Sequence, residues 1–177
     1  MKKVLVIIDM QNDFVDKTVL GNEECNAVIP KIVEKIEKGD HTHIIFTQDT
    51  HNETYMDTQE GKNLPVPHCL TGTIGHCIVE DIRNAAQKQM KPMLFINKNT
   101  FGSRNLAENI MTLKPDEVEF VGVCTSICVV SNVLGVKMFN PELPLTVDAS
   151  CCACVTPESH KHALETMKMC QVKIINE

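Results

Sequence analysis

The chain has 177 residues, of which 43% are hydrophobic, and its formal net charge is −6. This length suits one domain with a substantial buried core, so we expect residues 1–177 to form a single domain. The apolar runs are too short to span a bilayer, and Lys and Arg form no cluster. The sequence therefore argues against binding to membranes or to nucleic acid.

Cysteine is unusually frequent, with nine residues and hence an odd number. The opening residues, MKK, lead directly into a strand-like segment without the pattern of a secretion signal. A disulfide framework is therefore not expected, and most of the thiols are expected to be small buried hydrophobes. A reducing compartment fits this composition, so we expect a cytoplasmic protein.

Short apolar runs recur along the chain and predict strands at residues 3–9, 43–49, 93–98, 117–123, 143–149 and 171–176. Their continuous Val, Ile and Phe content is typical of strands that are covered on both faces. Helical patterns lie at residues 26–39, 103–113, 126–139 and 156–170. This alternation predicts an α/β fold with a mostly parallel sheet and right-handed crossovers.

Titratable residues stand at the ends of the first three predicted strands, namely Asp9, Asp49 and Lys98. Because the carboxyl ends of parallel strands form the ligand-binding edge of such a sheet, we expect these side chains to converge. Asp9 is either a turn-capping residue or a partly desolvated general base. Lys98 either reaches solvent or holds the carboxylate and favours a nearby thiolate.

The stretch FVGVCTSICVV follows the fourth predicted strand and contains Cys124 and Cys128. Their spacing leaves a metal pair, a redox pair, two buried thiols or a nucleophile open. Gly122 permits a tight turn, and the next helix is expected to begin near Thr125 or Ser126. Cys128 would then lie in the first helical turn, where N–H groups stabilise a thiolate or an oxyanion. Cys124 lies before the helix, which weakens the two pair interpretations.

The polar segment DTHNETYMDTQEGKNLPVPHC follows the second predicted strand and is longer than an ordinary connection. Asp49 and His51 alternate along an extended chain and should project to one side. Glu60 and His68 lie further along. Two imidazoles with one or two carboxylates suit Zn, Fe or Mn, although a solvated loop with incidental histidines would look similar.

Five motifs occur in one order along the chain: VIIDMQNDF, TQDTH, LPVPHCLTGTIG, INKNTFGS and GVCTSICV. Together they resemble the isochorismatase-like cysteine hydrolases, and more closely the nicotinamidase branch of that family. The resemblance runs from Lys3 to about Ile175. It implies a three-layer α/β/α fold with a six-stranded parallel sheet. It also implies a catalytic triad of Asp9, Lys98 and Cys128, and we expect Lys98 to depress the pKa of the Cys128 thiol.

In the nicotinamidase branch a divalent metal ion is bound close to the triad. The resemblance implies that Asp49, His51 and His68 bind this ion here. Glu60 is the preferred further ligand, with Asp57 as the alternative. The ion would be Zn, Fe or Mn, and it would anchor the ring of the substrate.

The resemblance further implies a cis peptide bond between Val123 and Cys124, which turns backbone N–H groups inward. The oxyanion hole would then consist of the N–H groups of Cys124 and Cys128. Two departures from the family bear on the substrate. Ser126 stands where the family usually has Asp, and the chain has no Trp to line the ring pocket.

Phe14 and Phe101 are therefore expected to be substrate-binding walls of the pocket, with Tyr55 as a further candidate. The stretch SCCAC, residues 150–154, has no family role that we can name, and Cys151, Cys152 and Cys154 keep no assignment. We expect it just past the fifth strand, with its small thiols packed before a helix.

These observations predict a cysteine-dependent amidohydrolase that converts nicotinamide, or a similar small aromatic amide, to the acid and ammonia through a thioester. One alternative is a family member that hydrolyses another small amide, ureido compound or imide. Another is a thiol-rich metal-binding or redox-sensing protein. The expected partner is a small-molecule amide substrate, and a homo-oligomer is possible.

Overall fold

The computed structural model of the chain describes residues 1–15 and 18–177. In this described part, six strands form one parallel sheet in the order β3-β2-β1-β4-β5-β6. The strands are β1 Lys3–Ile8, β2 His43–Asp49, β3 Met93–Lys98, β4 Glu117–Val123, β5 Leu145–Ala153 and β6 Lys173–Ile175. The predicted parallel sheet is confirmed.

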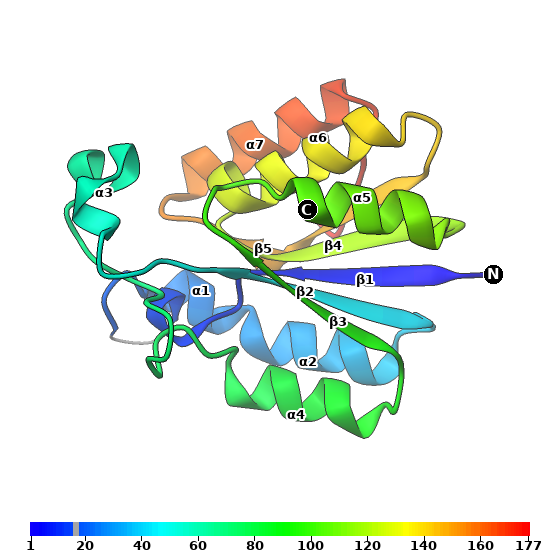
Figure 1. Cartoon of the computed structure of the whole chain (residues 1–177). Helices are drawn as coiled ribbons and strands as arrows, with labels where there is room; N and C mark the ends of the chain where they lie inside the picture. The colour runs from blue at the N-terminus through cyan, green and yellow to red at the C-terminus, as the bar shows by residue number, and fades with distance from the viewer. Residues whose placement is uncertain (16–17) are drawn as a thin grey trace.

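Two helical layers cover the sheet (Figure 1). The helices are α1 Glu23–Ala27, α2 Ile29–Lys38, α3 Gln59–Asn63, α4 Glu80–Lys88, α5 Arg104–Leu113, α6 Val130–Phe139 and α7 Pro157–Met169. Helices α1, α2 and α4 lie on one face, and α5, α6 and α7 lie on the other. Helix α3 stands away from both layers, beside the ends of β1 and β2. The predicted three-layer α/β/α arrangement is confirmed.

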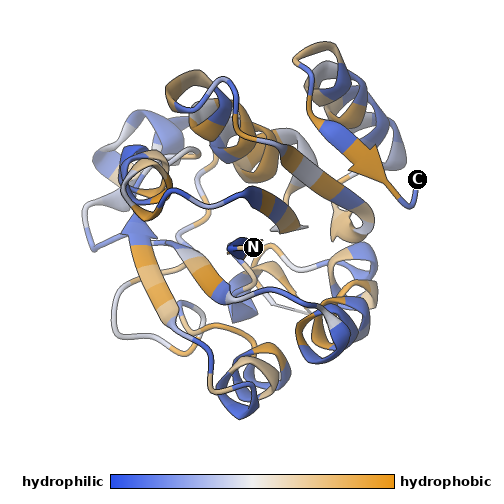
Figure 2. Cartoon of the chain, turned by 90° about the vertical axis from the view of Figure 1, so that its right-hand side faces the viewer, coloured by the Kyte–Doolittle hydropathy of each residue, from blue (hydrophilic) through white to orange (hydrophobic). Residues whose placement is uncertain are grey.

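The core is divided by the sheet into two hydrophobic clusters, because alternate strand residues point to opposite faces. In β1, Val4, Val6 and Ile8 pack toward α5–α7, whereas Leu5 and Ile7 pack toward α1, α2 and α4. All five are fully buried. Strand β1 therefore reads as a continuous apolar run. Figure 2 shows hydrophobic residues along the strands, with hydrophilic bands between them on several strands.

Two helical expectations need correction. Residues 26–39 form two helices rather than one, which meet at Val28. Pro30 in the first turn of α2 has no N–H to donate to the preceding turn, so it begins a helix and does not continue one. Helix α4 was not predicted. Its buried face consists of Ile82, Ala85 and Ala86, and alanine gives little hydrophobic signal.

The expectation that SCCAC lies past the fifth strand is wrong. Strand β5 continues to Ala153, so only Cys154 lies beyond it. Cys151, Cys152 and Ala153 are buried, and Cys152 and Ala153 pair with β4. Because small cysteine side chains pack well on either face of an inner strand, Cys151 and Cys152 continue the apolar run of β5.

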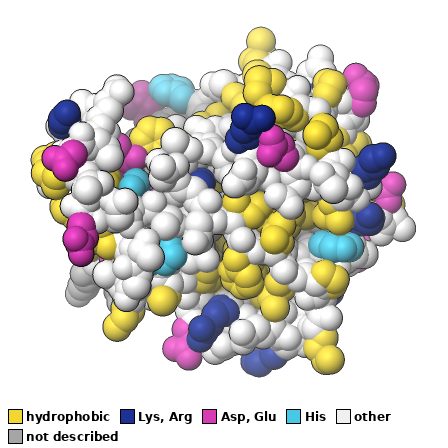
Figure 3. All heavy atoms as spheres, viewed as in Figure 1, with side chains coloured by type: hydrophobic (Ala, Val, Ile, Leu, Met, Phe, Trp, Pro, Cys, Tyr) yellow, Lys and Arg dark blue, Asp and Glu magenta, His cyan; other side chains and the backbone are white. Residues whose placement is uncertain are grey.

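Acidic and basic side chains are scattered over the face shown in Figure 3, with no gathering of one sign. This agrees with the absence of a Lys/Arg cluster in the sequence. Among the described residues, no helix has the length and apolar character needed to cross a membrane.

Candidate active site

Three segments bring Asp9, Lys98 and Cys128 to the carboxyl edge of the sheet. Asp9 follows the central strand β1, and Lys98 is the last residue of β3. Cys128 lies in a π-helical turn, Thr125–Val129, between β4 and α6. The predicted convergence of these strand ends is thus seen in the structure.

The Lys98 ammonium group lies between the other two side chains. Its Nζ is 2.6 Å from Oδ2 of Asp9 and 3.7 Å from Sγ of Cys128. The thiol is also within hydrogen-bonding reach of the Asp9 carboxylate. Thr47 donates a hydrogen bond of 2.6 Å to Oδ1 of Asp9. Asp9 has a φ of 49°, a left-handed conformation that turns it out of the strand direction.

The expectation that the Cys128 thiol has a depressed pKa is wrong. Burial raises its pKa well above the ordinary value, the charge of Asp9 raises it further, and the opposing effect of Lys98 is smaller. Burial likewise raises the pKa of Asp9, against the lowering effect of Lys98. Burial disfavours the charge on Lys98, but the surrounding acidic groups outweigh it and raise the lysine pKa. The resting cluster is a protonated thiol held beside a base and a cation.

The turn that carries Cys128 has the predicted cis peptide bond between Val123 and Cys124. The N–H groups of Ile127 and Val129 both donate to the Cys124 carbonyl at 3.1 Å. The helical segment begins at Thr125, as predicted, but its first turn is π-helical rather than α-helical. Single π-helical turns occur often at functional sites.

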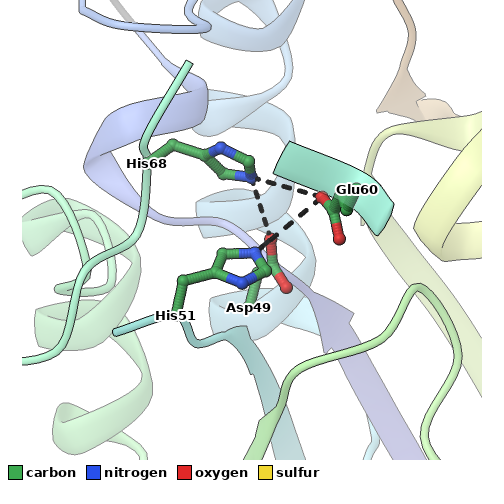
Figure 4. Close-up of side chains that lie close together, drawn as sticks. All are labelled: Asp49, His51, Glu60 and His68. Carbon is green, nitrogen blue, oxygen red and sulfur yellow. Dashed lines mark hydrogen bonds and ion pairs between the residues drawn. The ribbon is translucent and has the colours of Figure 1, made fainter. Parts of the chain in front are cut away.

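Four side chains form a second cluster beside the first (Figure 4). Oδ2 of Asp49 is 3.1 Å from Nε2 of His51 and 3.3 Å from Nε2 of His68. Oε1 of Glu60, on α3, is 3.8 and 3.7 Å from the same two nitrogens. Among the described residues, this is the one group of three or more potential ligands that lie close enough to share an ion. Asp57, the alternative ligand, is exposed and outside the group.

Donor atoms that bind one ion at about 2.0–2.2 Å lie roughly 2.8–3.6 Å apart in tetrahedral or adjacent octahedral positions. The observed separations of 3.1–3.8 Å come close to this range, so the cluster fits a divalent ion. Burial opposes ionisation of Asp49, but hydrogen bonds with His51 and His68 outweigh it and lower the Asp49 pKa. Burial and the charge of Asp49 raise the pKa of Glu60.

Buried hydrogen bonds hold these ligands in place. Gln11 is fully buried, donates to the backbone carbonyl of Asp49 at 2.9 Å and accepts from its N–H at 2.7 Å. Nδ1 of His68 bonds to the Val66 carbonyl at 2.8 Å, which orients Nε2 toward the cluster. Sequence reasoning missed Gln11 and Thr47. Gln11 could have been found, because it is a polar residue inside the otherwise buried IIDMQNDF motif.

A cavity of about 900 Å³ opens beside the second cluster, and its lining reaches the sequence neighbours of Lys98 and Cys128 without including either residue. Its described lining includes His51 and Glu60, the aromatic side chains Tyr55 and Phe101, and Ile127, but neither Lys nor Arg. Phe101 therefore lines this cavity, and its assignment as a substrate-binding wall stays a prediction. Phe14 instead packs against the His68 ring, with centroids 5.6 Å apart, and is not among the described lining residues.

Ser126, the departure from the family pattern, has its hydroxyl 2.9 Å from Sγ of Cys154. Ser159 donates to the same sulfur at 3.3 Å. Hydrogen bonding from Cys124, with further help from the two hydroxyls, overcomes burial and lowers the pKa of Cys154 to about 4. Cys154 is buried, and its hydroxyl partners differ from the Lys98 ammonium group that contacts Cys128.

The fold and site describe a three-layer α/β protein with a buried Asp–Lys–Cys cluster beside a group suited to a metal ion. Residues 3–176 match the Isochorismatase domain family, and the chain belongs to this family. The uncharacterized isochorismatase family protein PncA of Bacillus subtilis is 28% identical over 177 residues, covering 93% of each chain.

Solved structures show the same fold. The pyrazinamidase/nicotinamidase of Streptococcus mutans is 25% identical, with a TM-score of 0.84 over 98% of this chain and 100% of that chain. The pyrazinamidase of Pyrococcus horikoshii in complex with zinc is 22% identical, with a TM-score of 0.76 and complete coverage of both chains. The predicted family and fold are therefore confirmed.

Proposed function

We propose that the protein is a cysteine-dependent amidohydrolase that converts nicotinamide, or a similar small aromatic amide, to the carboxylic acid and ammonia. The observation that carries this proposal is the buried Cys128 thiol held beside Asp9 and Lys98. The names of similar family members, among them the Streptococcus mutans pyrazinamidase/nicotinamidase, support the substrate class.

The reaction begins with proton transfer. Because the resting thiol is protonated, Asp9 accepts its proton as the Cys128 sulfur attacks the amide carbon. Lys98 stabilises the negative charge that passes between these two groups. The backbone N–H groups of Cys124 and Cys128 are proposed to stabilise the oxyanion.

Collapse of the tetrahedral intermediate breaks the carbon–nitrogen bond. The proton on Asp9 moves to the leaving nitrogen, ammonia departs, and a thioester joins the acyl group to Cys128. Asp9 then takes a proton from water as the water oxygen attacks the thioester carbon. The carbon–sulfur bond breaks, the thiol recovers the proton, and the carboxylic acid leaves.

We propose that Asp49, His51, Glu60 and His68 bind a divalent ion such as Zn, Fe or Mn. The donor set and its spacing fit such an ion, and the zinc complex of the Pyrococcus horikoshii pyrazinamidase supports this choice. The ion would supply a Lewis-acid contact that anchors the substrate ring. The protein residues then only need to hold the amide carbon against the Cys128 sulfur.

The cavity favours a neutral substrate. Phe101, Tyr55 and Ile127 offer apolar surface to a ring, and the described lining includes neither Lys nor Arg to pair with a substrate carboxylate. Ureido compounds that carry an acid group are therefore less suitable than a neutral aromatic amide. A different neutral amide is the alternative that a substrate panel must test.

Ammonia release tests the proposed function. Wild-type protein is incubated with nicotinamide and with a panel of amides, ureido compounds and imides, beside the variants Cys128→Ala and Cys170→Ala. Cys170 is an exposed thiol at the end of α7 and serves as the matched control. We expect wild-type and Cys170→Ala to release ammonia from nicotinamide and Cys128→Ala to release none. Full turnover by Cys128→Ala would overturn the proposal, and release only from another substrate would reassign the substrate.

Metal analysis tests the ligand group independently. Protein purified without chelator should contain about one divalent ion per chain, and His68→Ala should contain much less. His162→Ala is the control, because His162 is an exposed histidine on α7. Equal metal content in the His68 and His162 variants would contradict the assignment.

A further inference from the structure

Asn132 is a buried polar side chain that the proposed mechanism does not use. It lies on α6, one helical turn after Cys128, and is 2% exposed. Its Nδ2 donates to the Cys128 carbonyl at 2.8 Å and to the Phe101 carbonyl at 3.0 Å. Its Oδ1 accepts from the Ser103 N–H at 2.9 Å. The amide therefore uses both donors and an acceptor, and two of these bonds leave its own helix.

These bonds join two segments that are distant in sequence. One is the stretch from Lys98 to Ser103, which connects the end of β3 to the start of α5 and carries the Phe101 wall. The other is the turn that carries Cys128. Both ends of the Lys98–Cys128 contact thus depend on segments that Asn132 ties together.

Burying the asparagine side chain at this position costs free energy unless its hydrogen bonds offset the lost hydration. The buried surface of α6 otherwise consists of Val133 and Val136, and Val129 precedes them at the end of the π-helical turn. All three are fully buried in the hydrophobic core. A buried amide must regain in hydrogen bonds what it loses in hydration, and an apolar side chain would avoid this cost. A buried polar side chain whose hydrogen bonds are all made restricts the segments that it bonds to a single relative arrangement.

We infer that Asn132 is a positioning residue that locks the Phe101 wall and the Lys98 strand end to the Cys128 turn. The effect on turnover rests on the proposed amidohydrolase function, whereas the effect on the Cys128 environment does not. When the lock is removed, the stretch that follows Lys98 moves relative to the turn. Both substrate binding at Phe101 and the reactivity of the thiol then change.

Two variants separate the bonds. Asn132→Leu keeps the branching and the number of side-chain heavy atoms and removes every side-chain hydrogen bond. Asn132→Ser retains a hydroxyl that can bond back to the Cys128 carbonyl within the helix, but it is too short to reach Phe101 or Ser103. Asn140→Leu is the matched control, because Asn140 ends α6 and donates to the Val136 carbonyl at 3.2 Å, again four residues back.

The first readout needs no substrate. The rate of Cys128 alkylation by iodoacetamide is followed against pH, with the modified peptide identified by mass spectrometry. The second readout is kcat and KM for ammonia release from nicotinamide, and thermal unfolding reports folding. We expect both Asn132 variants to shift the alkylation profile, raise KM and lower kcat/KM about 10- to 100-fold. Asn140→Leu should match wild type within about twofold.

Each result decides the inference. Wild-type alkylation and kinetics in Asn132→Leu would overturn it. Wild-type behaviour in Asn132→Ser would also overturn it, because the bond within the helix would then suffice. Should Asn132→Leu fail to fold, Asn132→Ser carries the test. If wild-type protein hydrolyses no amide, the proposed function fails, and the alkylation profile alone decides the role of Asn132.

Discussion

Replacement of Lys98 by methionine should cost both stability and activity. Methionine keeps the apolar stem of the side chain and removes the ammonium group. Lys98 and Asp9 are almost completely buried, and Nζ also lies 3.5 Å from Oδ1 of Asp49. Without the cation, Asp9 and Asp49 lose the charge they share, and the imidazoles at Asp49 and the Thr47 hydroxyl at Asp9 are left to stabilise them. Breaking a buried ion pair from one side costs about 3–5 kcal/mol, a large part of the usual 5–15 kcal/mol of a folded domain.

Lys35→Met provides a matched control outside the candidate active site. Lys35 lies on α2 between two carboxylates, at 2.5 Å from Oε1 of Glu119 and 2.7 Å from Oδ2 of Asp148. Its side chain is 16% exposed, against 2% for Lys98, so water compensates part of the loss. We expect Lys35→Met to lose stability toward the lower end of the same range and to keep its turnover once folded.

Two separate measurements are made. Stability is measured by urea unfolding in the presence of a chelator, and turnover is measured as ammonia release by metal-loaded protein. Chelation keeps a bound ion from compensating Asp49 and so isolates the contribution of Lys98. At concentrations of urea where both variants are folded, Lys98→Met should turn over about 10²–10⁴-fold more slowly than Lys35→Met. Equal turnover in the two variants would refute the role given to Lys98, whatever their stabilities.

Two further predictions concern the scaffold. Gly122→Ala should lower the free energy of unfolding by about 2–6 kcal/mol, because φ at Gly122 is +120° and the added Cβ would overlap the Ile8 carbonyl; an unfolding curve that matches wild type would contradict this. Burial raises the pKa values of Glu119 and Asp148, but hydrogen bonds and charge, including those of Lys35, outweigh it and lower both. The ionised Glu119 and Asp148 carboxylates stabilise the fold above their ordinary pKa values of 4.5 and 3.8, and this contribution is lost as pH falls below those values. Wild type should therefore lose more stability in acid than Lys35→Met. Urea unfolding at several pH values would measure the difference.

The sequence predicts the sheet well because its inner strands are buried on both faces. The bounds of the inner strands β2 and β4, and of the edge strand β3, agree with the predicted runs, since each run ends where polar or turn residues begin. The predicted fifth strand ends too early, because cysteine fits a buried strand as well as a packed turn and so does not indicate where the strand ends. The break at Val28 was missed because the apolar spacing continues through it, and only Pro30 marks the new helix.

The site was predictable where topology alone decides proximity. Residues at the ends of adjacent parallel strands must meet, and this brings Asp9, Asp49 and Lys98 together without knowledge of any side-chain contact. The ionisation of Cys128 was not predictable in this way. Its pKa depends on the competition between burial and two charges, and burial exceeds the effect of the neighbouring lysine only in the folded protein. The bonds of Asn132 depend on a helix approaching a loop, which no local pattern indicates.

The raised pKa of the thiol changes which residue controls the proposed reaction. A thiol that is already ionised at rest would need only a cation and an open approach. Here burial keeps Cys128 protonated, so the sulfur becomes a nucleophile only while Asp9 takes its proton. The position of that carboxylate then matters as much as the acidity of the thiol. This explains why Asp9 is held from both oxygens, by the Thr47 hydroxyl at Oδ1 and by Lys98 at Oδ2, on a backbone turned out of the strand at φ 49°.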